Sequence, residues 1–287
     1  MNRRAFLWSA AGFAALTASR DAMAAGGLQE RFAAIEMAAK GRLGVTFLDT
    51  GTGRRLAYRG AERFPLLSTS KVLIAGFVLA RVDQGKESLK RRVIYSQSSV
   101  LSYAPVTKLR VRDGMTIGEL CAAALEVSDN TAANLLLESF GGPKGLTAWL
   151  RSIGDDVSRL DRTEPTLNDV RPGDPRDTTT PSAVADTLKK LLIGDRLSAA
   201  SRRQLTDWMI AGKTGATRLR AGLPTGWRVG DKTGTNNTGA NDIAIAWPPG
   251  RAPLIITSYL ADADVSPRQR EAAHADVARI AASWRPA

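Results

Sequence analysis

Apolar residues at helical spacing mark both ends of the chain. Near the N-terminus, Leu28, Phe32, Ile35 and Ala39 recur every three or four residues and predict an amphipathic helix that ends at Gly41. Near the C-terminus, Ser266-Pro267 is a helix-start signal. The helix predicted there carries Ala273, Val277, Ile280 and Trp284 on one face.

Strand-like segments lie next to these helices, and the middle of the chain is helical. Strands are predicted over residues 43–48, 54–58, 227–235, 242–247 and 254–260. The first two flank the turn 49–53 and predict a β-hairpin. Residues 61–210 show mostly helical spacing, with a capping box at Thr116–Glu119 and a loop at 171–180.

This order of elements predicts an α+β fold. Both ends of the chain are expected to supply one antiparallel β-sheet, with the terminal helices packed on it and an all-helical domain inserted between them. The expected boundaries are 25–60 with 211–287 for the sheet domain, and 61–210 for the helical domain. A cleft between the two is the natural place for a functional site.

The first 24 residues have the features of an export signal. Arg3-Arg4 precede an apolar, alanine-rich run, and Ala22-Met23-Ala24 is typical of a cleavage site. The arginine pair favours a twin-arginine signal, with a general secretory signal as the alternative. Either route predicts a periplasmic protein without stable membrane association once the signal is removed.

The net charge and the number of cysteines argue against some kinds of protein. The 287-residue chain has 40 Lys and Arg against 28 Asp and Glu, a net charge of +12 that falls to about +10 without the signal. The basic residues are scattered and lack an aromatic-rich motif, which argues against nucleic-acid binding. Cys121 is the only cysteine, so the chain forms no intramolecular disulfide, and its apolar neighbours predict a buried thiol.

His274 is the only histidine, in a helix predicted at the surface. A zinc site built from several histidines is therefore excluded, and a Ser-His-Asp triad nearly so. Any hydrolytic chemistry must take its base from lysine or glutamate.

Ser68 and Lys71 form the first candidate catalytic pair. A serine three residues before a lysine shares a helical face with it, and the apolar run 72–82 predicts that this helix is buried. The positive end of the helix would favour negative charge developing at Ser68. A buried lysine there needs a partner or a lowered pKa, and either helps to remove the Ser68 proton.

Two further motifs have the right groups for a hydrolase. In Ser128-Asp129-Asn130, a hydroxyl and an amide on a turn can relay a proton and hold a substrate amide. Glu164 and Asn168 lie four residues apart on a turn and can grip one water, with the carboxylate as general base.

A Lys-Thr-Gly tripeptide occurs twice. The copy at 232–234 ends a predicted strand, whereas the copy at 213–215 enters a loop and is interpreted as plain loop. In the strand copy, Lys232 supplies charge for an anionic group, Thr233 and Thr235 supply hydroxyls, and Gly234 allows close backbone approach. The Thr235 and Ser68 N–H groups can form an oxyanion hole.

Together and in this order, these motifs resemble those of the class A serine β-lactamases. The resemblance runs through nearly the whole chain after the signal. It includes Tyr103-Ala104-Pro105-Val106, Thr131-Ala132-Ala133-Asn134-Leu135-Leu136, Asp161-Arg162-Thr163-Glu164-Pro165 and Arg176-Asp177-Thr178-Thr179-Thr180-Pro181.

The resemblance implies a role for each position. Ser68 would be the acylated nucleophile, Lys71 its proton partner, and Ser128 the donor to the β-lactam nitrogen. Glu164 and Asn168 would position and activate the water that removes the acyl group. Whether Lys71 or Glu164 starts acylation is disputed for the family and stays open.

It also implies the substrate contacts. Asn130 would hold the substrate side-chain amide and Tyr103 would wall the cleft. Lys232, Thr233, Thr235 and, as in some members, Arg218 would receive the substrate carboxylate. Arg162 and Asp177 would close an Ω-type loop, about residues 159–177, that carries Glu164. No cofactor or metal is implied, and a monomer acting on small β-lactams is expected.

Two other functions share part of this pattern. A penicillin-binding DD-peptidase has similar serine–lysine and Lys-Thr-Gly elements, but it does not need Glu164 with Asn168. A non-catalytic β-lactam sensor would need a membrane tether and a signalling domain. The chain also departs from some members, because Leu67 and Asn236 exclude a disulfide found in certain carbapenem-hydrolysing enzymes, and segment 236–240 is slightly short.

Overall fold

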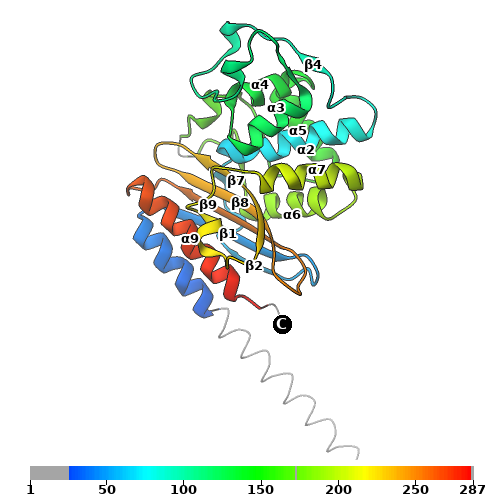
Figure 1. The fold of residues 1–287 in the computed structure, drawn as a ribbon. Coiled ribbons are helices and arrows are strands. Elements are labelled where there is room, and N and C mark those ends of the chain that lie inside the picture. The colour runs from blue at the N-terminus through cyan, green and yellow to red at the C-terminus, as the bar shows by residue number, and fades with distance from the viewer. Residues whose placement is uncertain (1–25, 172, 286–287) are drawn as a thin grey trace, which may run out of the picture.

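The computed structural model describes residues 26–171 and 173–285, so the predicted signal at 1–24 lies outside the described residues. A five-stranded antiparallel sheet has the order β2-β1-β9-β8-β7 (Figure 1). Eight paired positions join β1 to β9, which places the first strand beside the last and confirms that both ends build one sheet. The strands are β1 (Arg42–Asp49), β2 (Arg55–Tyr58), β7 (Arg228–Thr235), β8 (Ala240–Trp247) and β9 (Leu254–Ala261).

The terminal helices lie side by side on one face of this sheet, as expected (Figure 1). They are the helix over residues 26–39 and α9 (Pro267–Ser283), which begins with a capping box at Ser266. Phe32 packs edge-on against Phe47 of β1, with 5.7 Å between ring centroids. These apolar faces meet in a core that also contains the short helix α8 (Leu219–Gly222).

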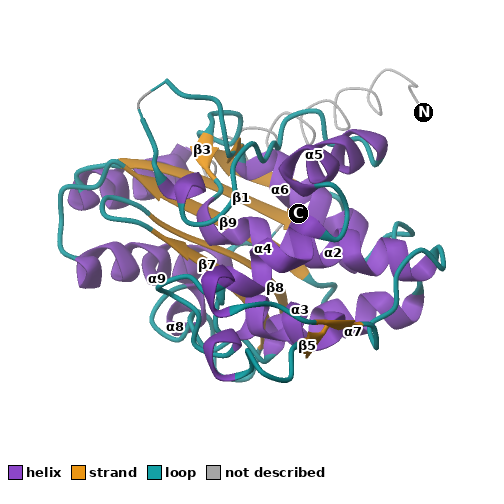
Figure 2. Ribbon diagram, turned by 90° about the horizontal axis from the view of Figure 1, so that it is seen from above, coloured by secondary structure: helices purple, strands orange, loops and turns teal. Residues whose placement is uncertain are grey.

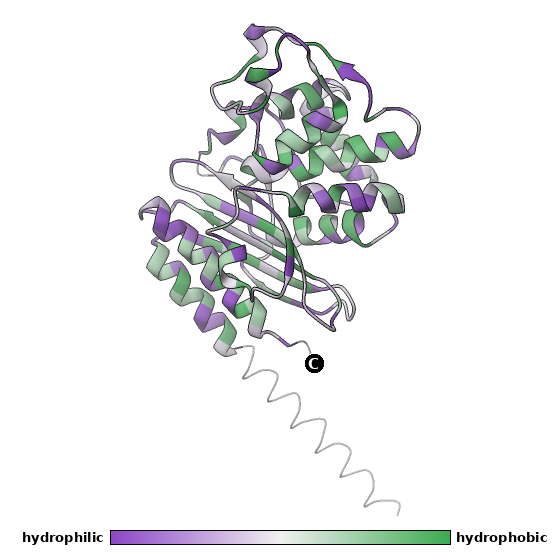
Figure 3. Cartoon of the chain, viewed as in Figure 1, coloured by the Kyte–Doolittle hydropathy of each residue, from purple (hydrophilic) through white to green (hydrophobic). Residues whose placement is uncertain are grey.

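The helical part of the chain packs around one buried helix, α2 (Ser70–Asp83). Residues 70–76 and 78–80 of α2 are all buried, which explains why its sequence lacks a polar stripe, and the helix is mostly green in the view of Figure 3. Phe77 stacks on Trp149 at 4.8 Å, and Cys121 is buried in the same core, as predicted. The other helices are α3 (Ile117–Glu126), α4 (Asn130–Glu138), α5 (Gly142–Ser152), α6 (Pro181–Leu192) and α7 (Ala199–Ile210).

Two short ladders interrupt the expected all-helical segment (Figure 2). One pairs β3 (Phe64–Pro65) with β6 (Thr178–Thr179), and the other pairs β4 (Arg92–Val93) with β5 (Met115–Thr116). The prediction of loop over 171–180 was therefore wrong at Thr178–Thr179. The pairing to β3 is a long-range contact that no local pattern indicates. Among the described residues, no helix is both long and apolar enough to cross a membrane.

His274 faces the sheet, although α9 itself lies on the outside of the molecule as predicted. The imidazole is fully buried, with Nδ1 2.7 Å from Ser258 Oγ and Nε2 3.0 Å from the Ala240 carbonyl oxygen. Burial, and next the charge of Arg218, lower the pKa of His274 from 6.5 to about 3.

Stability should therefore depend on pH through His274. Between pH 6.5 and about 3 the unfolded chain binds a proton that the folded chain does not, so the free energy of unfolding falls as pH falls. The slope from this group is about 1.4 kcal/mol per pH unit. His274→Asn should lack this contribution. Urea unfolding measured at about pH 7 and at about pH 5 should therefore show a loss of unfolding free energy that is smaller in the variant than in the wild type by about 2 kcal/mol. Equal falls in both proteins would contradict the assignment.

Candidate active site

A tight turn places Ser68 at the start of α2. The sequence predicted Ser68 at the tip of the α-helix, but it lies in a 3-10 turn, Leu67–Thr69, and α2 begins at Ser70. The Thr69 hydroxyl donates to the Leu66 carbonyl at 2.6 Å and closes the turn. Leu67 has φ 49°, a left-handed conformation that is strained for leucine and is typical of functional sites.

Lys71 is the centre of the site. Its side chain is fully buried, and burial lowers the pKa of its ammonium, although the Glu164 carboxylate opposes this shift. The Nζ atom lies 2.9 Å from Ser68 Oγ, 3.0 Å from Ser128 O, 3.2 Å from Ser128 Oγ, 2.6 Å from Asn130 Oδ1 and 2.9 Å from Glu164 Oε1. The predicted serine–lysine pair is thus in direct contact with the predicted glutamate.

Glu164 lies between the nucleophile candidate and an amide. Its Oε1 is 3.5 Å from Ser68 Oγ, and its Oε2 accepts a hydrogen bond of 2.7 Å from Asn168 Nδ2. The Asn168 Oδ1 atom is buried and has no partner among the described residues. A carboxylate and a free amide oxygen at this spacing can hold a water next to Ser68.

Asn134 fixes the backbone of Glu164, and the sequence analysis gave it no role. Its Nδ2 donates to the Glu164 carbonyl at 2.9 Å, and its Oδ1 accepts from the Glu164 amide at 3.0 Å. Asn134 follows Asn130 by four residues, so both side chains lie on one face of α4. The four-residue spacing from Asn130 was the feature of the sequence that could have placed Asn134 beside the site.

Ser128 Oγ lies between two ammonium groups. Lys71 Nζ is 3.2 Å from it and Lys232 Nζ is 3.1 Å from it. Lys232 is also buried, and this burial, followed by the charge of Lys71, holds the pKa of Lys232 well below its ordinary value. This hydroxyl can therefore give up a proton and take one back from either lysine.

The strand β7 approaches the Ser68 turn closely at Gly234. A Cβ atom on Gly234 would lie 2.9 Å from the Leu67 Cβ and 3.2 Å from the Ser68 nitrogen, so only glycine fits. Asn241 of β8 donates to the Pro65 carbonyl at 2.8 Å and ties the sheet to the same turn.

Arg218 lies beneath the edge of β7. Its Nη2 donates to Thr235 Oγ1 at 2.6 Å, and its Nη1 donates at 2.8 Å to the carbonyls of Gly234 and Asn241. Burial lowers the pKa of this guanidinium, and its Nε has no partner among the described residues. It adds a buried positive charge next to the hydroxyl of Thr235.

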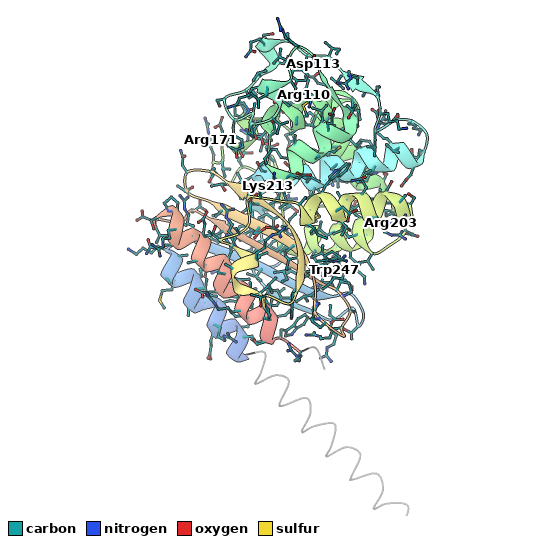
Figure 4. The ribbon with its side chains drawn as sticks, viewed as in Figure 1. Arg110, Asp113, Arg171, Arg203, Lys213 and Trp247 are labelled. Carbon is teal, nitrogen blue, oxygen red and sulfur yellow. The ribbon has the colours of Figure 1, made fainter. Side chains whose placement is uncertain are left out.

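The other Lys-Thr-Gly copy also reaches the site. Residues 213–215 do form a loop, and Figure 4 shows Lys213 at the junction of the sheet and the helices. Thr214, however, lines the cleft and shares a hydrogen bond of 2.6 Å with Thr233. The interpretation as plain loop was wrong for Thr214, because packing against β7 brings its hydroxyl to the site.

These groups surround one cleft of about 370 Å³. Tyr103 stands at its edge, 51% exposed, with its hydroxyl 3.3 Å from the Val127 carbonyl. Lys71, Glu164 and Lys232 lie under the cleft and contact its lining. The lining residues are Ser68, Tyr103, Ser128, Asn130, Asn168, Thr214, Arg218, Thr233, Gly234 and Thr235.

Arg162 and Asp177 lie outside the cleft, at the base of the loop that carries Glu164. Arg162 Nε donates to Asp177 Oδ2 at 2.6 Å, and the backbone amides of Asp161 and Arg162 donate to Asp177 Oδ1. Arg162 also reaches the Asp169 carbonyl at 3.1 Å, so it joins both sides of the loop.

The fold and this cleft define a serine hydrolase with a buried lysine and glutamate. Residues 27–284 match the model of the beta-lactamase enzyme family. The chain is 50% identical to beta-lactamase L2 of Stenotrophomonas maltophilia over 93% of this chain and 86% of that protein. It is 48% identical to beta-lactamase CTX-M-8 of Citrobacter amalonaticus, over 89% and 87%.

Solved structures agree with these matches. An ancestral class A beta-lactamase of Gram-negative bacteria superposes with a TM-score of 0.88 at 61% identity, covering 88% of this chain and 98% of that one. A putative class A beta-lactamase, PenP of Rhodopseudomonas palustris, gives 0.88 at 56% identity, over 89% and 98%. This chain belongs to the class A β-lactamases.

Removing Arg162 should loosen the loop that carries Glu164. In Arg162→Met, the loop loses its charged contact to Asp177 and its contact to Asp169, so amides of residues 159–177 should exchange at least tenfold faster. Hydrogen-exchange mass spectrometry measures this rate. Arg176→Met is the matched control, because the Arg176 side chain lies on the same loop and forms only a partly exposed pair with Asp174. Equal exchange in both variants would show that Arg162 does not close the loop.

Proposed function

We propose that the chain hydrolyses the β-lactam amide through an ester on Ser68, and that Glu164 activates the water that cleaves this ester. One observation carries the proposal: Lys71 Nζ is 2.9 Å from both Ser68 Oγ and Glu164 Oε1. A nucleophile and two proton acceptors are thus in mutual contact, as covalent catalysis requires.

In the acylation step, Ser68 Oγ attacks the β-lactam carbonyl and its proton passes to the Lys71–Glu164 pair. The backbone N–H groups of Ser68 and Thr235 stabilise the oxyanion. The C–N bond then breaks, and the leaving nitrogen takes the proton of Ser128 Oγ. Lys71 Nζ, 3.2 Å away, passes the proton taken from Ser68 on to Ser128 Oγ, and Lys232 Nζ, 3.1 Å away, donates a hydrogen bond that holds this hydroxyl in place.

In the deacylation step, a water held by Glu164 and Asn168 attacks the ester carbonyl. Glu164 takes the proton of this water. When the C–O bond to Ser68 breaks, this proton passes through the Lys71–Glu164 pair to Ser68 Oγ, which leaves as the alcohol. What supports this step is the pairing of Glu164 Oε2 with Asn168 Nδ2 at 2.7 Å, which leaves Asn168 Oδ1 free to accept from the water. The reaction needs no cofactor.

The β7 side of the cleft receives the substrate carboxylate. Lys232 and Arg218 supply the charge, and Thr233 and Thr235 supply hydroxyls. Asn130 holds the substrate side-chain amide, and Tyr103 packs against the substrate at the cleft mouth. The specific support is the hydrogen bond between Arg218 and Thr235, which orients that hydroxyl.

We also propose the setting in which the enzyme works. The arginine pair at Arg3-Arg4 and the site at Ala22-Met23-Ala24 support export to the periplasm, where the enzyme would confer β-lactam resistance. We propose that the enzyme works as a monomer. We also propose a sheet domain, 25–60 with 211–287, and a helical domain, 61–210. What supports the first is the core between the terminal helices and the sheet, whose residues all lie within 25–60 and 211–287.

Glu164→Ala should trap the ester. Acylation proceeds at Ser68, but without the general base the release should slow by about a hundredfold or more. Intact mass spectrometry after mixing with a penicillin should show a persistent adduct. A Ser68→Ala control should show no adduct. Rapid return of Glu164→Ala to free enzyme would rule out Glu164 as the deacylation base, and a wild-type adduct that never turns over would indicate a DD-peptidase or a sensor.

Arg218→Ala should weaken binding of the substrate carboxylate. Loss of one buried charge next to Thr235 should raise KM about tenfold or more, with a smaller change in kcat. Steady-state hydrolysis followed by absorbance measures both constants. Arg228→Ala is the control, because Arg228 is exposed at the start of β7, at the opposite end of the strand from Thr235, and packs on Trp247. A KM unchanged from the wild-type value would remove Arg218 from the site.

A further inference from the structure

The helical part of the molecule ends in a surface that combines positive charge with exposed aliphatic side chains. Figure 4 shows Arg110 and Asp113 in this region, at the end remote from the sheet. We call this surface the basic tip. It consists of Lys90, Arg92, Ile94, Lys108, Leu109 and Arg112, all exposed, and none of them lines the cleft.

The basic tip is formed by two segments, residues 90–95 and 107–115. Strand pairing and side-chain hydrogen bonds hold them together. The β4–β5 ladder pairs Val93 with Met115, and the Tyr95 hydroxyl donates to the Thr107 carbonyl at 2.7 Å. The Arg92 guanidinium donates to the carbonyls of Asp113 and Gly114 at 3.0 and 3.1 Å. Residues about 15 to 20 positions apart in sequence therefore form one ordered surface.

The aliphatic side chains of the basic tip are unusually exposed. Leu109 is 75% exposed and Ile94 is 68% exposed. The terminal methyl of Ile94 lies over Gly114, where an added Cβ would fall 2.7 Å from it. Leu109 directly follows Lys108 in the sequence, and Ile94 lies two residues after Arg92, so each exposed aliphatic residue has a cationic residue of the basic tip close to it in the chain.

The charge of the basic tip is largely uncompensated. Neighbouring Arg91 and Arg110 are paired with Glu87 and Glu119. By contrast, the structure shows no ion pair from Lys90, Arg92, Lys108 or Arg112 to any described residue. Asp113 is the one acidic residue between positions 90 and 113.

We propose that the basic tip docks reversibly on the surface of a phospholipid bilayer that contains anionic phosphatidylglycerol. Cations attract the headgroups, and the two exposed aliphatic side chains enter the interface. A protein partner with an acidic face would match the charge but would normally bury aromatic anchors, and Tyr95 is already buried here. The association uses no membrane-spanning helix and is therefore weak and sensitive to salt.

Vesicle binding by the full chain, freed of its predicted signal, tests this proposal. Phosphatidylcholine vesicles with and without phosphatidylglycerol are sedimented with the protein at about 0.02 M and about 0.3 M salt. Binding is expected only with phosphatidylglycerol and should weaken at the higher salt. Neutralising four charges, in K90Q/R92Q/K108Q/R112Q, should lower binding more than a hundredfold, at about fivefold per charge.

The control removes the same charge from other exposed places. Arg31, Lys40, Arg203 and Arg268 are exposed and form no ion pair with a described residue, so R31Q/K40Q/R203Q/R268Q should change binding by about threefold or less. Ile94→Ser with Leu109→Ser keeps the charge and should lower binding about tenfold. All variants should keep β-lactam hydrolysis, which reports folding. If the quadruple tip variant does not fold, the double variant K108Q/R112Q is tested in its place, with K40Q/R268Q as its control.

Three results would overturn the proposal. They are no binding to phosphatidylglycerol vesicles, equal loss in the tip and control variants, and full binding by the serine variant. Equal loss would mean that only net charge matters, and full binding by the serine variant would mean that the aliphatic side chains stay in water. The proposed catalytic function is unaffected by any of these outcomes, since hydrolysis is measured separately.

Discussion

The site depends on a buried ammonium. Removing the Lys71 charge from water costs several kcal/mol, and the cost is offset only if the ammonium meets well-placed oxygens. Those oxygens come from the Ser68 turn, the connection between α3 and α4, the start of α4 and the loop at Glu164. The burial of Lys71 is therefore stable only when all of these segments are in their native positions, so the lysine couples them to one another.

Other contacts hold these acceptor oxygens in place. Asn134 grips the backbone of Glu164, and Arg162 with Asp177 closes the loop on either side of it. Asp129 accepts five hydrogen bonds from Val106, Thr107 and Ala132, so the segment after Tyr103 is tied to α4. These residues do not line the cleft, but they fix the positions of the segments that supply the oxygens around Lys71.

Much of this could be predicted from the sequence, because the information was local. The periodicity of residues 28–39 and the alternation in the terminal strands reflect which face is buried, and the motifs at Ser68, Ser128 and Lys232 keep fixed spacings. The role of Thr214 depended instead on long-range packing. Gly215 lies so close to Asp231 that an added Cβ would be 1.5 Å from its Oδ2, and this contact brings Thr214 against Thr233. The inward orientation of His274 likewise depends on the register of α9 over β8 and β9.

The surplus of basic residues has two different physical consequences. Inside the molecule, positive charge is balanced by acids: Arg220 pairs with Asp231, and Asp242 accepts from the amide of Leu219, next to Arg218. Burial raises the pKa values of Asp231 and Asp242, because removing a carboxylate from water disfavours its charged form. At the basic tip the charges are in water, where an unpaired cation costs little. The buried site therefore does not account for the charges of the basic tip, whereas the proposed docking on an anionic bilayer would use them.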